Sequence, residues 1–446
     1  MGKLFGTDGI RGLAYEYPID LETGQRLGRS LVKFCADRGL STGFIIGRDT
    51  RESGEALEKA VSYGIISAGG NCRSAGVLPT PGIAYLTKIT NSDAGIVLSA
   101  SHNPYEYNGF KVFSNRGYKL SETEEMELEE MILCDTGKFN TIEPRQPELM
   151  EDADNKYISF LLQTSPDLEK LQEFKVIIDC ANGATSRVAP TLFKKLNINM
   201  EFIFSEPDGR NINRNCGSQH TRALSEKVID GKANLGLAFD GDGDRFIAVD
   251  EKGDTLTGDQ IIAICAGMLS ERKALSNNIV VSTIMSNMGL GVALKKLGID
   301  HVTTGVGDRL VMEEMRRRNA SLGGENSGHI IFSDHHTTGD GILSALKLME
   351  AILFYKKSLS EISKIMDIYP QVLINVPVNK KPDIERTPEI KGIINEVERD
   401  LDYEGRVLVR YSGTEPLCRV MVEGKSQAEI ERHAQKIADV IAEELN

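Results

Sequence analysis

The chain has 446 residues, 40% of them hydrophobic and 26% charged, and this composition excludes disordered and fibrous proteins. Its 65 acidic and 52 basic residues give a formal net charge of −13, which argues against bulk attraction to nucleic acid or to an anionic membrane. The length predicts about three domains, since single cores stop growing well below this size.

The first element in chain order is a helix that Asp20 can cap and that is expected to run to Gly39. A second helix is expected after Ser121, which forms a capping box with Glu124. Short apolar runs that end at a polar or glycine-containing loop recur between such helices. They are FIIGRDTR (44–51), GIVLSASHNP (95–104), VIIDCANGA (176–184), LGLAFDGDGD (235–244) and IVVSTIMSN (279–287).

Runs of this length that are apolar on both faces predict strands buried between layers of helices. Their alternation with amphipathic stretches predicts an α/β architecture with mixed, mostly parallel sheets. The chemistry of such sheets lies on the loops that follow the carboxyl ends of strands. The C-terminal stretch 407–424 differs, because it predicts two strands around a polar loop, and a helix opened by Ser426 and Glu429 follows it.

We therefore expect four domains, namely three similar α/β domains and a smaller C-terminal α+β domain. The expected boundaries lie in the polar stretch near 137–152, at the turn Glu251–Asp254 and near Tyr369–Pro370. The domains are residues 1–150, 151–253, 254–368 and 369–446.

The loop that follows the strand near 95–98 has the sequence Ser99-Ala100-Ser101-His102-Asn103-Pro104. A serine at a strand end beside a histidine could be a nucleophile, but no G-x-S-x-G elbow is present. We expect that His102 cannot readily reach back to Ser101 as a base. On its own this loop is also compatible with a polar turn.

The strand at 235–239 leads into Asp240-Gly241-Asp242-Gly243-Asp244. Three carboxylates so close together repel one another unless a cation binds them, and oxygen ligands suit Mg²⁺ or Ca²⁺. An EF-hand is the alternative, since Glu251 falls at its twelfth position. Arg245, however, occupies the sixth position, where an EF-hand needs glycine, and both flanks read as strands.

A phosphoryl group on Ser101 would give this metal a further anionic oxygen, and the metal would neutralise that phosphate. Two other loops carry polar side chains. Gly323–His329 has short side chains that suit sugar hydroxyls, and Arg410–Glu415, with Arg419 close behind, has the hydroxyls, glycine and guanidinium groups of a phosphate clamp.

Seven cysteines are scattered without a C-x-x-C pair, which predicts neither a disulfide framework nor a thiolate zinc site. The start MGKLFGTDGI does not resemble a signal peptide, and no apolar run reaches the roughly 18 residues that span a bilayer. We therefore expect a cytoplasmic protein.

Five of these segments together resemble the α-D-phosphohexomutase superfamily. They are FGTDGIRG (5–12), SASHNP (99–104), DGDGDR (240–245), GENSGH (324–329) and RYSGTEP (410–416), which occur in the order and spacing of that family. The segments TTGVGDRLVMEEM (303–315) and EPLCRVMVEG (415–424) are similar to the bacterial phosphoglucosamine mutases within it.

The resemblance implies that Ser101 is a phosphoserine and that its phosphate binds Mg²⁺ together with Asp240, Asp242 and Asp244. It implies a role in proton transfer for Lys111. The other implied residues surround the transferring group (Arg11, Arg245 and His329), bind sugar hydroxyls (Glu325 and Ser327) or hold the non-reacting phosphate (Arg410, Ser412, Thr414 and Arg419).

The implied activity is the interconversion of glucosamine 6-phosphate and glucosamine 1-phosphate, which supplies amino-sugar nucleotide and cell-wall precursors. One Mg²⁺ per chain and a sugar 1,6-bisphosphate would be the cofactors. A hexosamine phosphate would be the partner, without nucleic acid or membrane, and a homodimer is left open. Two positions depart from the usual pattern, because Tyr411 replaces a proline, which is expected to loosen the phosphate loop, and Asn326 replaces a longer glutamine.

Three alternatives remain at this point. The first is a phosphomannomutase or phosphoglucomutase of the same superfamily, and the second is a metal-dependent sugar phosphatase that uses the same phosphoserine. The third is a calcium-binding or sugar-phosphate-sensing protein without catalytic activity.

Overall fold

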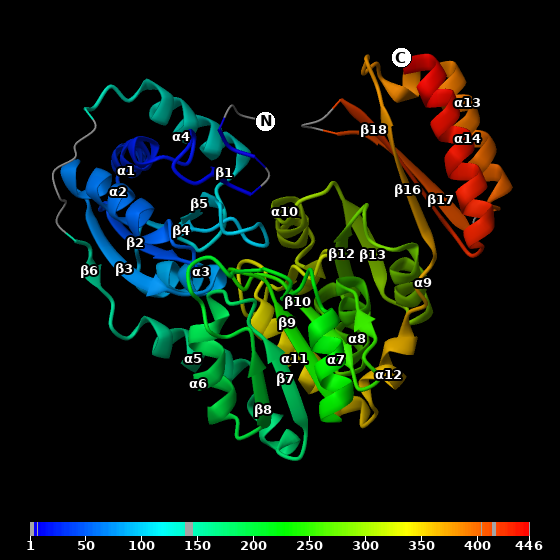
Figure 1. Ribbon diagram of the computed structural model, residues 1–446, viewed down its shortest axis with the longest axis horizontal. Helices are drawn as coiled ribbons and strands as arrows, with labels where there is room; N and C mark the ends of the chain where they lie inside the picture. Colours follow the sequence, from blue (N-terminus) through cyan, green and yellow to red (C-terminus); the bar gives the residue numbers. More distant parts are fainter. Residues whose placement is uncertain (1–3, 7, 139–145, 403, 413–415, 446) are drawn as a thin grey trace. The chain divides into compact units, whose positions relative to one another are not determined.

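A computed structural model describes residues 4–6, 8–138, 146–402, 404–412 and 416–445 of the protein. The chain forms two compact units. The larger comprises Met1–Met285 and Leu297–Ile365, and the smaller comprises Ser286–Lys296 and Met366–Asn446. Three sheets belong to the larger unit and a fourth belongs to the smaller (Figure 1).

The first sheet has the strand order β1-β5-β4-β2-β3-β6 and is mixed. Strands β4, β2, β3 and β6 run parallel to one another, whereas β5 is antiparallel to both β4 and β1. Its elements are β1 (Ile10–Leu13), α1 (Leu21–Ala36), β2 (Gly43–Arg48), α2 (Gly54–Ser67), β3 (Asn71–Val77), α3 (Thr80–Ile89), β4 (Ala94–Leu98), β5 (Tyr107–Ser114), α4 (Glu122–Cys134) and β6 (Glu148–Leu149).

The two helix starts predicted in this part of the chain are confirmed. Asp20 caps α1 by accepting a hydrogen bond of 2.7 Å from the Thr23 amide, and Ser121 forms its capping box at the start of α4. Helix α1 ends at Ala36 rather than at Gly39. Gly39 has a φ of +71°, which a right-handed helix cannot contain, so it lies in the turn after the helix.

Strand β4 is buried on both faces, as its apolar sequence predicts. Ile96 and Leu98 pack in one core with Leu27 and Leu31 of α1, and no part of these four side chains is exposed. Burying a side chain of this size stabilises the fold by roughly 1.5–3 kcal/mol. This packing fixes the end of β4, from which the Ser101 loop departs.

The second sheet has the order β11-β10-β9-β7-β8, with parallel pairs on either side of β7 and two antiparallel pairs toward β11. The turn predicted at Glu251–Asp254 joins β10 to β11, and these two strands pair with each other. The elements of this region are α5 (Ala153–Thr164), β7 (Lys175–Asp179), α6 (Thr185–Lys195), β8 (Asn199–Ile203), α7 (Arg222–Gly231), β9 (Leu235–Phe239), β10 (Phe246–Asp250) and β11 (Thr255–Leu256).

The third sheet has the order β13-β12-β14-β15, with β12 parallel to both of its neighbours and β15 antiparallel to β14. Its elements are α8 (Gly258–Glu271), β12 (Ile279–Thr283), β13 (Asp300–Thr304), α10 (Asp308–Arg318), β14 (Leu322–Gly324), β15 (Ile330–Phe332), α11 (Gly341–Tyr355) and α12 (Leu359–Ile362). Helix α9 (Met288–Lys296) lies between β12 and β13 in sequence but belongs to the smaller unit.

The smaller unit has an antiparallel sheet of order β16-β18-β17, which α13 and α14 cover on one face (Figure 1). Val420 and Val422 pack in its core with Ile430 and Ile437. Its sheet and helices are β16 (Gln371–Pro377), α13 (Pro388–Asp400), β17 (Gly405–Tyr411), β18 (Leu417–Gly424) and α14 (Gln427–Leu445). The two strands predicted around a polar loop at 407–424 are confirmed.

These sheets confirm the predicted fold class of three α/β domains with mixed sheets and a smaller C-terminal α+β domain. All seven cysteines are free thiols. Among the residues that the structure describes, no helix has both the length and the apolar character needed to cross a bilayer.

Candidate active site

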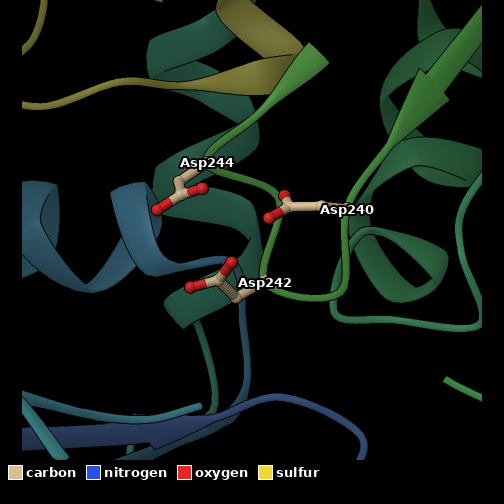
Figure 2. Close-up of side chains that lie close together, drawn as sticks. All are labelled: Asp240, Asp242 and Asp244. Atoms are coloured by element: carbon tan, nitrogen blue, oxygen red, sulfur yellow. The ribbon is translucent and has the colours of Figure 1, made fainter. Parts of the chain in front are cut away.

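The three aspartates predicted to bind a metal lie on the tight loop between the antiparallel strands β9 and β10. Their carboxylates point toward one another from this loop (Figure 2). One oxygen from each of Asp240, Asp242 and Asp244 lies within 4.8 Å of the others, and all three residues are buried. Because the loop joins two strands and not two helices, the EF-hand alternative is wrong.

Oxygen atoms in this cluster are suited to a hard cation. The Oδ1 atoms of Asp242 and Asp244 are buried and have no hydrogen-bond partner among the described residues. Burial and the charges of the other two carboxylates raise the pKa of Asp240 well above its usual value. A divalent cation would relieve both the unsatisfied oxygens and the repulsion, so the donor set fits Mg²⁺.

Ser101 lies against this cluster. Its Oγ donates a hydrogen bond of 2.7 Å to Asp240 Oδ2, and only 1% of the residue is exposed. The backbone at Ser101 is left-handed, with φ +53°, and its amide donates to Ser99 Oγ at 2.9 Å. A Cβ at Gly241 would lie 2.7 Å from the Ser101 carbonyl oxygen, so only glycine permits the two loops to approach this closely.

A buried arginine, Arg51, binds the backbone of the Ser101 loop. Arg51 donates to the carbonyl oxygens of Ser101, Asn103 and Tyr107 at 3.0, 2.8 and 2.9 Å. Its Nε pairs with Asp49 at 2.9 Å, and both side chains are fully buried. The planar guanidinium group of Arg51 therefore holds the loop by several hydrogen bonds in fixed directions.

The structure corrects the expectation that His102 cannot reach Ser101. His102 Nδ1 lies 3.3 Å from Ser101 Oγ. The left-handed backbone at Ser101 turns the chain sharply, which folds the next side chain back beside the hydroxyl. Burial and the cationic neighbours Arg245 and Arg11 lower the pKa of His102 to about 4, so the ring is neutral near pH 7.

Lys111 enters the cluster from strand β5, where it is paired with Val97 of β4. Its Nζ lies 2.8 Å from Asp242 Oδ2 and 3.3 Å from Asp244 Oδ2. Burial lowers the pKa of this ammonium, but Asp242, Asp8 and Asp244 outweigh that effect and raise it well above its ordinary value. Lys111 is thus a buried cation beside the aspartates.

Arg11 reaches the same region from β1, which pairs with β5 so that Arg11 lies opposite Gly109. Arg11 forms an ion pair with Asp8, whose Oδ2 lies 3.0 Å from Lys111 Nζ. Burial opposes the ionisation of Asp8, but Lys111, Lys119 and Arg11 lower the pKa of its carboxyl well below the usual range.

His329 and Arg245 flank Asp244. His329 Nδ1 lies 3.7 Å from Asp244 Oδ2, and Arg245 Nε lies 4.0 Å from Asp244 Oδ1. Burial lowers the pKa of His329, but the carboxylates of Asp308 and Asp244 outweigh this effect and raise it above its ordinary value. Gly328, with φ +91°, lets this loop lie against β10, since a Cβ there would be 2.3 Å from the Phe246 carbonyl oxygen.

Glu325 and Ser327 lie on the same turn as His329. Their side chains face each other, with 3.5 Å between Ser327 Oγ and Glu325 Oε2, and Glu325 Oε1 accepts from the Gly307 amide at 3.2 Å. Both residues are partly exposed, whereas Asn326 between them is exposed, and its carbonyl oxygen accepts from the Gly258 amide at 3.0 Å. The turn therefore offers a carboxylate and a hydroxyl to solvent.

The predicted phosphate clamp lies in the smaller unit. Arg410 on β17 and Arg419 on β18 are paired directly across the sheet, and Ser412 follows β17 and is buried. Burial and the neighbouring Arg419 lower the pKa of Arg410. Tyr411 anchors the strand end, since its hydroxyl donates to the Pro382 carbonyl oxygen at 2.8 Å. Thr414 lies outside the described residues.

Three further charged residues contact the charged side chains of this site, and none of them was among the predicted site residues. These are Asp8, Lys119 and Asp308, of which Lys119 contacts both carboxylates. Asp8 and Asp308 lie inside segments that carry the family resemblance, FGTDGIRG and TTGVGDRLVMEEM, so an inspection of every charge in those segments would have found them. Lys119 lies in no such segment, and the sequence carries no signal for it.

Four domain models of one protein family match the chain. The three "alpha/beta/alpha" domain models of the phosphoglucomutase/phosphomannomutase family match residues 2–136, 155–253 and 257–369, in the order I, II and III. The C-terminal domain model of the same family matches residues 373–440.

Curated relatives and solved structures match over the whole length. The chain is 52% identical to a phosphoglucosamine mutase of Syntrophus aciditrophicus, with 100% of each chain covered, and 50% identical to one of Desulforapulum autotrophicum, with 99% of each covered. A crystal structure of a phosphoglucomutase/phosphomannomutase family protein from Burkholderia thailandensis has a TM-score of 0.80 at 22% identity, and covers 99% of this chain and 98% of its own. The chain therefore belongs to the phosphoglucomutase/phosphomannomutase family.

Proposed function

We propose that this protein is a phosphoglucosamine mutase, which interconverts glucosamine 6-phosphate and glucosamine 1-phosphate through a phosphorylated Ser101 and a sugar bisphosphate. The observation that carries the proposal is the hydrogen bond of 2.7 Å from Ser101 Oγ to Asp240, inside a cluster of three buried aspartates. Relatives named phosphoglucosamine mutase, 45–52% identical over the full chain, support the choice of sugar.

The reaction begins with a phosphoryl group on Ser101. The free hydroxyl oxygen of the sugar phosphate attacks the phosphorus, the bond from phosphorus to Ser101 Oγ breaks, and the hydroxyl proton leaves to a base. Lys111, within 3.3 Å of two aspartates, is the group we assign to this proton transfer. These carboxylates hold it as an ammonium. A cation bound to them would offset their charge and lower the pKa of Lys111, so that its neutral amine could accept the proton. The bisphosphate then reorients within the site, so that its other phosphoryl group faces Ser101. Ser101 Oγ attacks that phosphorus, and the bond from phosphorus to the sugar oxygen breaks.

Asp240, Asp242, Asp244 and the phosphate on Ser101 would hold Mg²⁺. When bound, this cation supplies positive charge that offsets the charge on the phosphoryl oxygens. Arg11, Arg245 and His329 would surround the phosphoryl group and orient it by charge-assisted hydrogen bonds. A sugar 1,6-bisphosphate would serve as intermediate and activator.

The remaining assignments concern the sugar and its second phosphate. Glu325 and Ser327 would bind sugar hydroxyls, since both present oxygen atoms on a partly exposed turn. Arg410, Ser412, Thr414 and Arg419 would hold the phosphate that does not react, because two adjacent guanidinium groups attract an anion. A cytoplasmic location with no nucleic-acid or membrane partner completes the proposal, and a homodimer is left open.

The sugar is tested by comparing kcat/KM for the 6-phosphates of glucosamine and glucose and for mannose 6-phosphate, with Mg²⁺ and a trace of bisphosphate. We expect glucosamine 6-phosphate to be preferred. A preference for glucose 6-phosphate or mannose 6-phosphate would show that the protein is instead a phosphoglucomutase or a phosphomannomutase. Release of free phosphate faster than isomerised sugar would instead indicate a phosphatase.

The phosphoserine is tested by Ser101→Ala, with Ser67→Ala at the end of α2 as a control. We expect intact mass to show one phosphate on part of the wild type and on part of the control, and none on Ser101→Ala. The same variant should lose nearly all mutase activity while it keeps its fold. Normal turnover by Ser101→Ala would contradict the proposed mechanism.

A further inference from the structure

Lys119 lies between two carboxylates that reach it from different parts of the larger unit. Its Nζ forms ion pairs with Asp8 Oδ1 and with Asp308 Oδ2. The three side chains are only 12, 20 and 11% exposed for Lys119, Asp8 and Asp308. Such pairs are screened little by solvent, so each contact has a substantial effect on the position of the groups involved.

The three residues come from separate elements. Asp8 precedes β1, Lys119 follows the turn after β5, and Asp308 is the first residue of α10. The position of Lys119 is fixed by its own backbone, because Lys119 forms a β-bridge with Phe113 of β5. Lys119 therefore joins the edge of the first sheet to the start of a helix that covers the third.

Each carboxylate continues from Lys119 into the candidate active site. Asp8 Oδ2 lies 3.0 Å from Lys111 Nζ, and Asp308 Oδ2 lies 3.3 Å from His329 Nε2. Lys111 and His329 in turn both face Asp244 Oδ2, at 3.3 and 3.7 Å. The six groups form a closed ring in which acidic and basic side chains alternate. In order they are Lys119, Asp8, Lys111, Asp244, His329 and Asp308.

In the order of this ring Lys119 lies opposite Asp244, and no contact given for the described residues joins it to Ser101 or to any of the three aspartates. It nevertheless separates two buried carboxylates. Without its ammonium, Asp8 and Asp308 would repel each other across a space of low polarity, and both would move or one would take up a proton. Either change would weaken the contact of Asp8 with Lys111 or that of Asp308 with His329, so that fewer carboxylates would hold these two side chains in place.

We infer that Lys119 is a positioning residue, which holds Lys111 and His329 toward the transferring phosphoryl group through Asp8 and Asp308. The inference rests on the proposed function, because it concerns the same reaction. Since Lys119 acts through other side chains, its loss should affect the chemical step more than substrate binding. A misplacement of about 1 Å in such groups can lower a rate on the order of 10²-fold.

The test measures kcat and KM of Lys119→Met, Lys119→Gln and wild type on glucosamine 6-phosphate, with the melting temperature of each. Methionine keeps most of the length of the side chain without its charge, and glutamine, of similar length, also keeps a hydrogen-bond donor. Lys33→Met is the matched control, because Lys33 is an exposed lysine on α1. We expect kcat to fall roughly a hundredfold in both Lys119 variants and KM to change less than about threefold. The control should match the wild type.

A double-mutant cycle with Asp308→Asn separates a shared role from two independent ones. If Lys119 acts through Asp308, the variant Lys119→Met/Asp308→Asn should lose little more kcat than the more impaired single variant. Losses that multiply, or a kcat within threefold of wild type in Lys119→Gln, would overturn the inference. If Lys119→Met does not fold, the comparison is made with Lys119→Gln.

The wild-type assay distinguishes a failure of this inference from a failure of the proposed function. If the wild type does not isomerise any hexose phosphate, the function is wrong. If the wild type is active and the Lys119 variants are equally active, only the inference about Lys119 is wrong.

Discussion

At the scale of single residues, Asp242 shows how one carboxylate can be oriented by its neighbours and still offer an oxygen to a cation. Its Oδ2 accepts hydrogen bonds from Thr80 Oγ1 at 2.5 Å and from Lys111 Nζ at 2.8 Å. Its Oδ1 is buried and has no partner among the described residues. The orientation of the carboxylate is therefore fixed before any cation binds, which lowers the entropic cost of binding.

Replacing this carboxylate tests the metal site without an activity measurement. Asp242→Asn removes one negative charge from the cluster, and we expect the dissociation constant for Mg²⁺, measured by calorimetry, to rise by roughly a hundredfold or more. Asp254→Asn is the control, because Asp254 is an exposed acid in the turn after β10. Equal Mg²⁺ affinities for wild type and Asp242→Asn would show that the cluster is not the binding site.

At the scale of elements, the Ser101 loop depends on a side chain from another loop. Arg51 spans the carbonyl oxygens of the loop while its own charge is balanced by Asp49, and neither side chain is exposed. Asp49 also accepts a hydrogen bond of 2.6 Å from Ser99 Oγ. The loops that follow β2 and β4 thus share one buried polar network. Loss of any side chain in it leaves a buried polar group of another residue without its partner.

We expect Arg51→Met to lower the free energy of unfolding by about 3–5 kcal/mol, because it leaves the Asp49 carboxylate buried without its counter-charge. Urea denaturation measures this change. Arg222→Met is the control: Arg222 and Glu226 form an ion pair with side chains 91 and 62% exposed, and removing an exposed pair costs at most about 1 kcal/mol. Similar losses in the two variants would contradict a special role for the buried network.

The same elements show which parts of the site could be predicted from sequence. The loops after β4 and β9 are local features, since an apolar strand and its polar loop are adjacent in the chain. The ring around Lys119 is not local, because Lys119 is 111 residues from Asp8 and 189 residues from Asp308. The contact of His102 with Ser101 was missed for a different reason, namely a left-handed backbone that the sequence does not reveal at a serine.

At the scale of the whole molecule, each sheet is formed by one continuous stretch of the chain, but the compact units do not follow this order throughout. Ser286–Lys296, which includes α9, is inserted between two strands of the third sheet and belongs to the C-terminal unit. The alternation of strands and helices gives no sign of this assignment, because it depends on side-chain contacts over more than a hundred residues.

A buried carboxylate accounts for the place of α9 in the smaller unit. Glu423 on β18 is fully buried and forms an ion pair with Arg406 of β17. Its Oε1 accepts a hydrogen bond of 2.9 Å from Asn287 Nδ2, just before α9 begins. Asn287 is held in turn by the backbone of Tyr369, with bonds of 2.9 and 3.0 Å. Glu423 thus joins the start of α9 to the C-terminal sheet.

Removing this carboxylate should release α9 from its unit. In Glu423→Ala, Asn287 and Arg406 lose their shared acceptor, which costs roughly 1–3 kcal/mol in local stability. We therefore expect the backbone amides of Ser286–Lys296 to exchange with deuterium about 5 to 150 times faster than in the wild type, as measured by mass spectrometry. Lys425→Ala, which breaks the exposed pair with Glu404, is the control and should leave this exchange unchanged. If exchange in α9 is equally slow in Glu423→Ala, other contacts hold the helix, and its place in the C-terminal unit does not depend on the buried carboxylate.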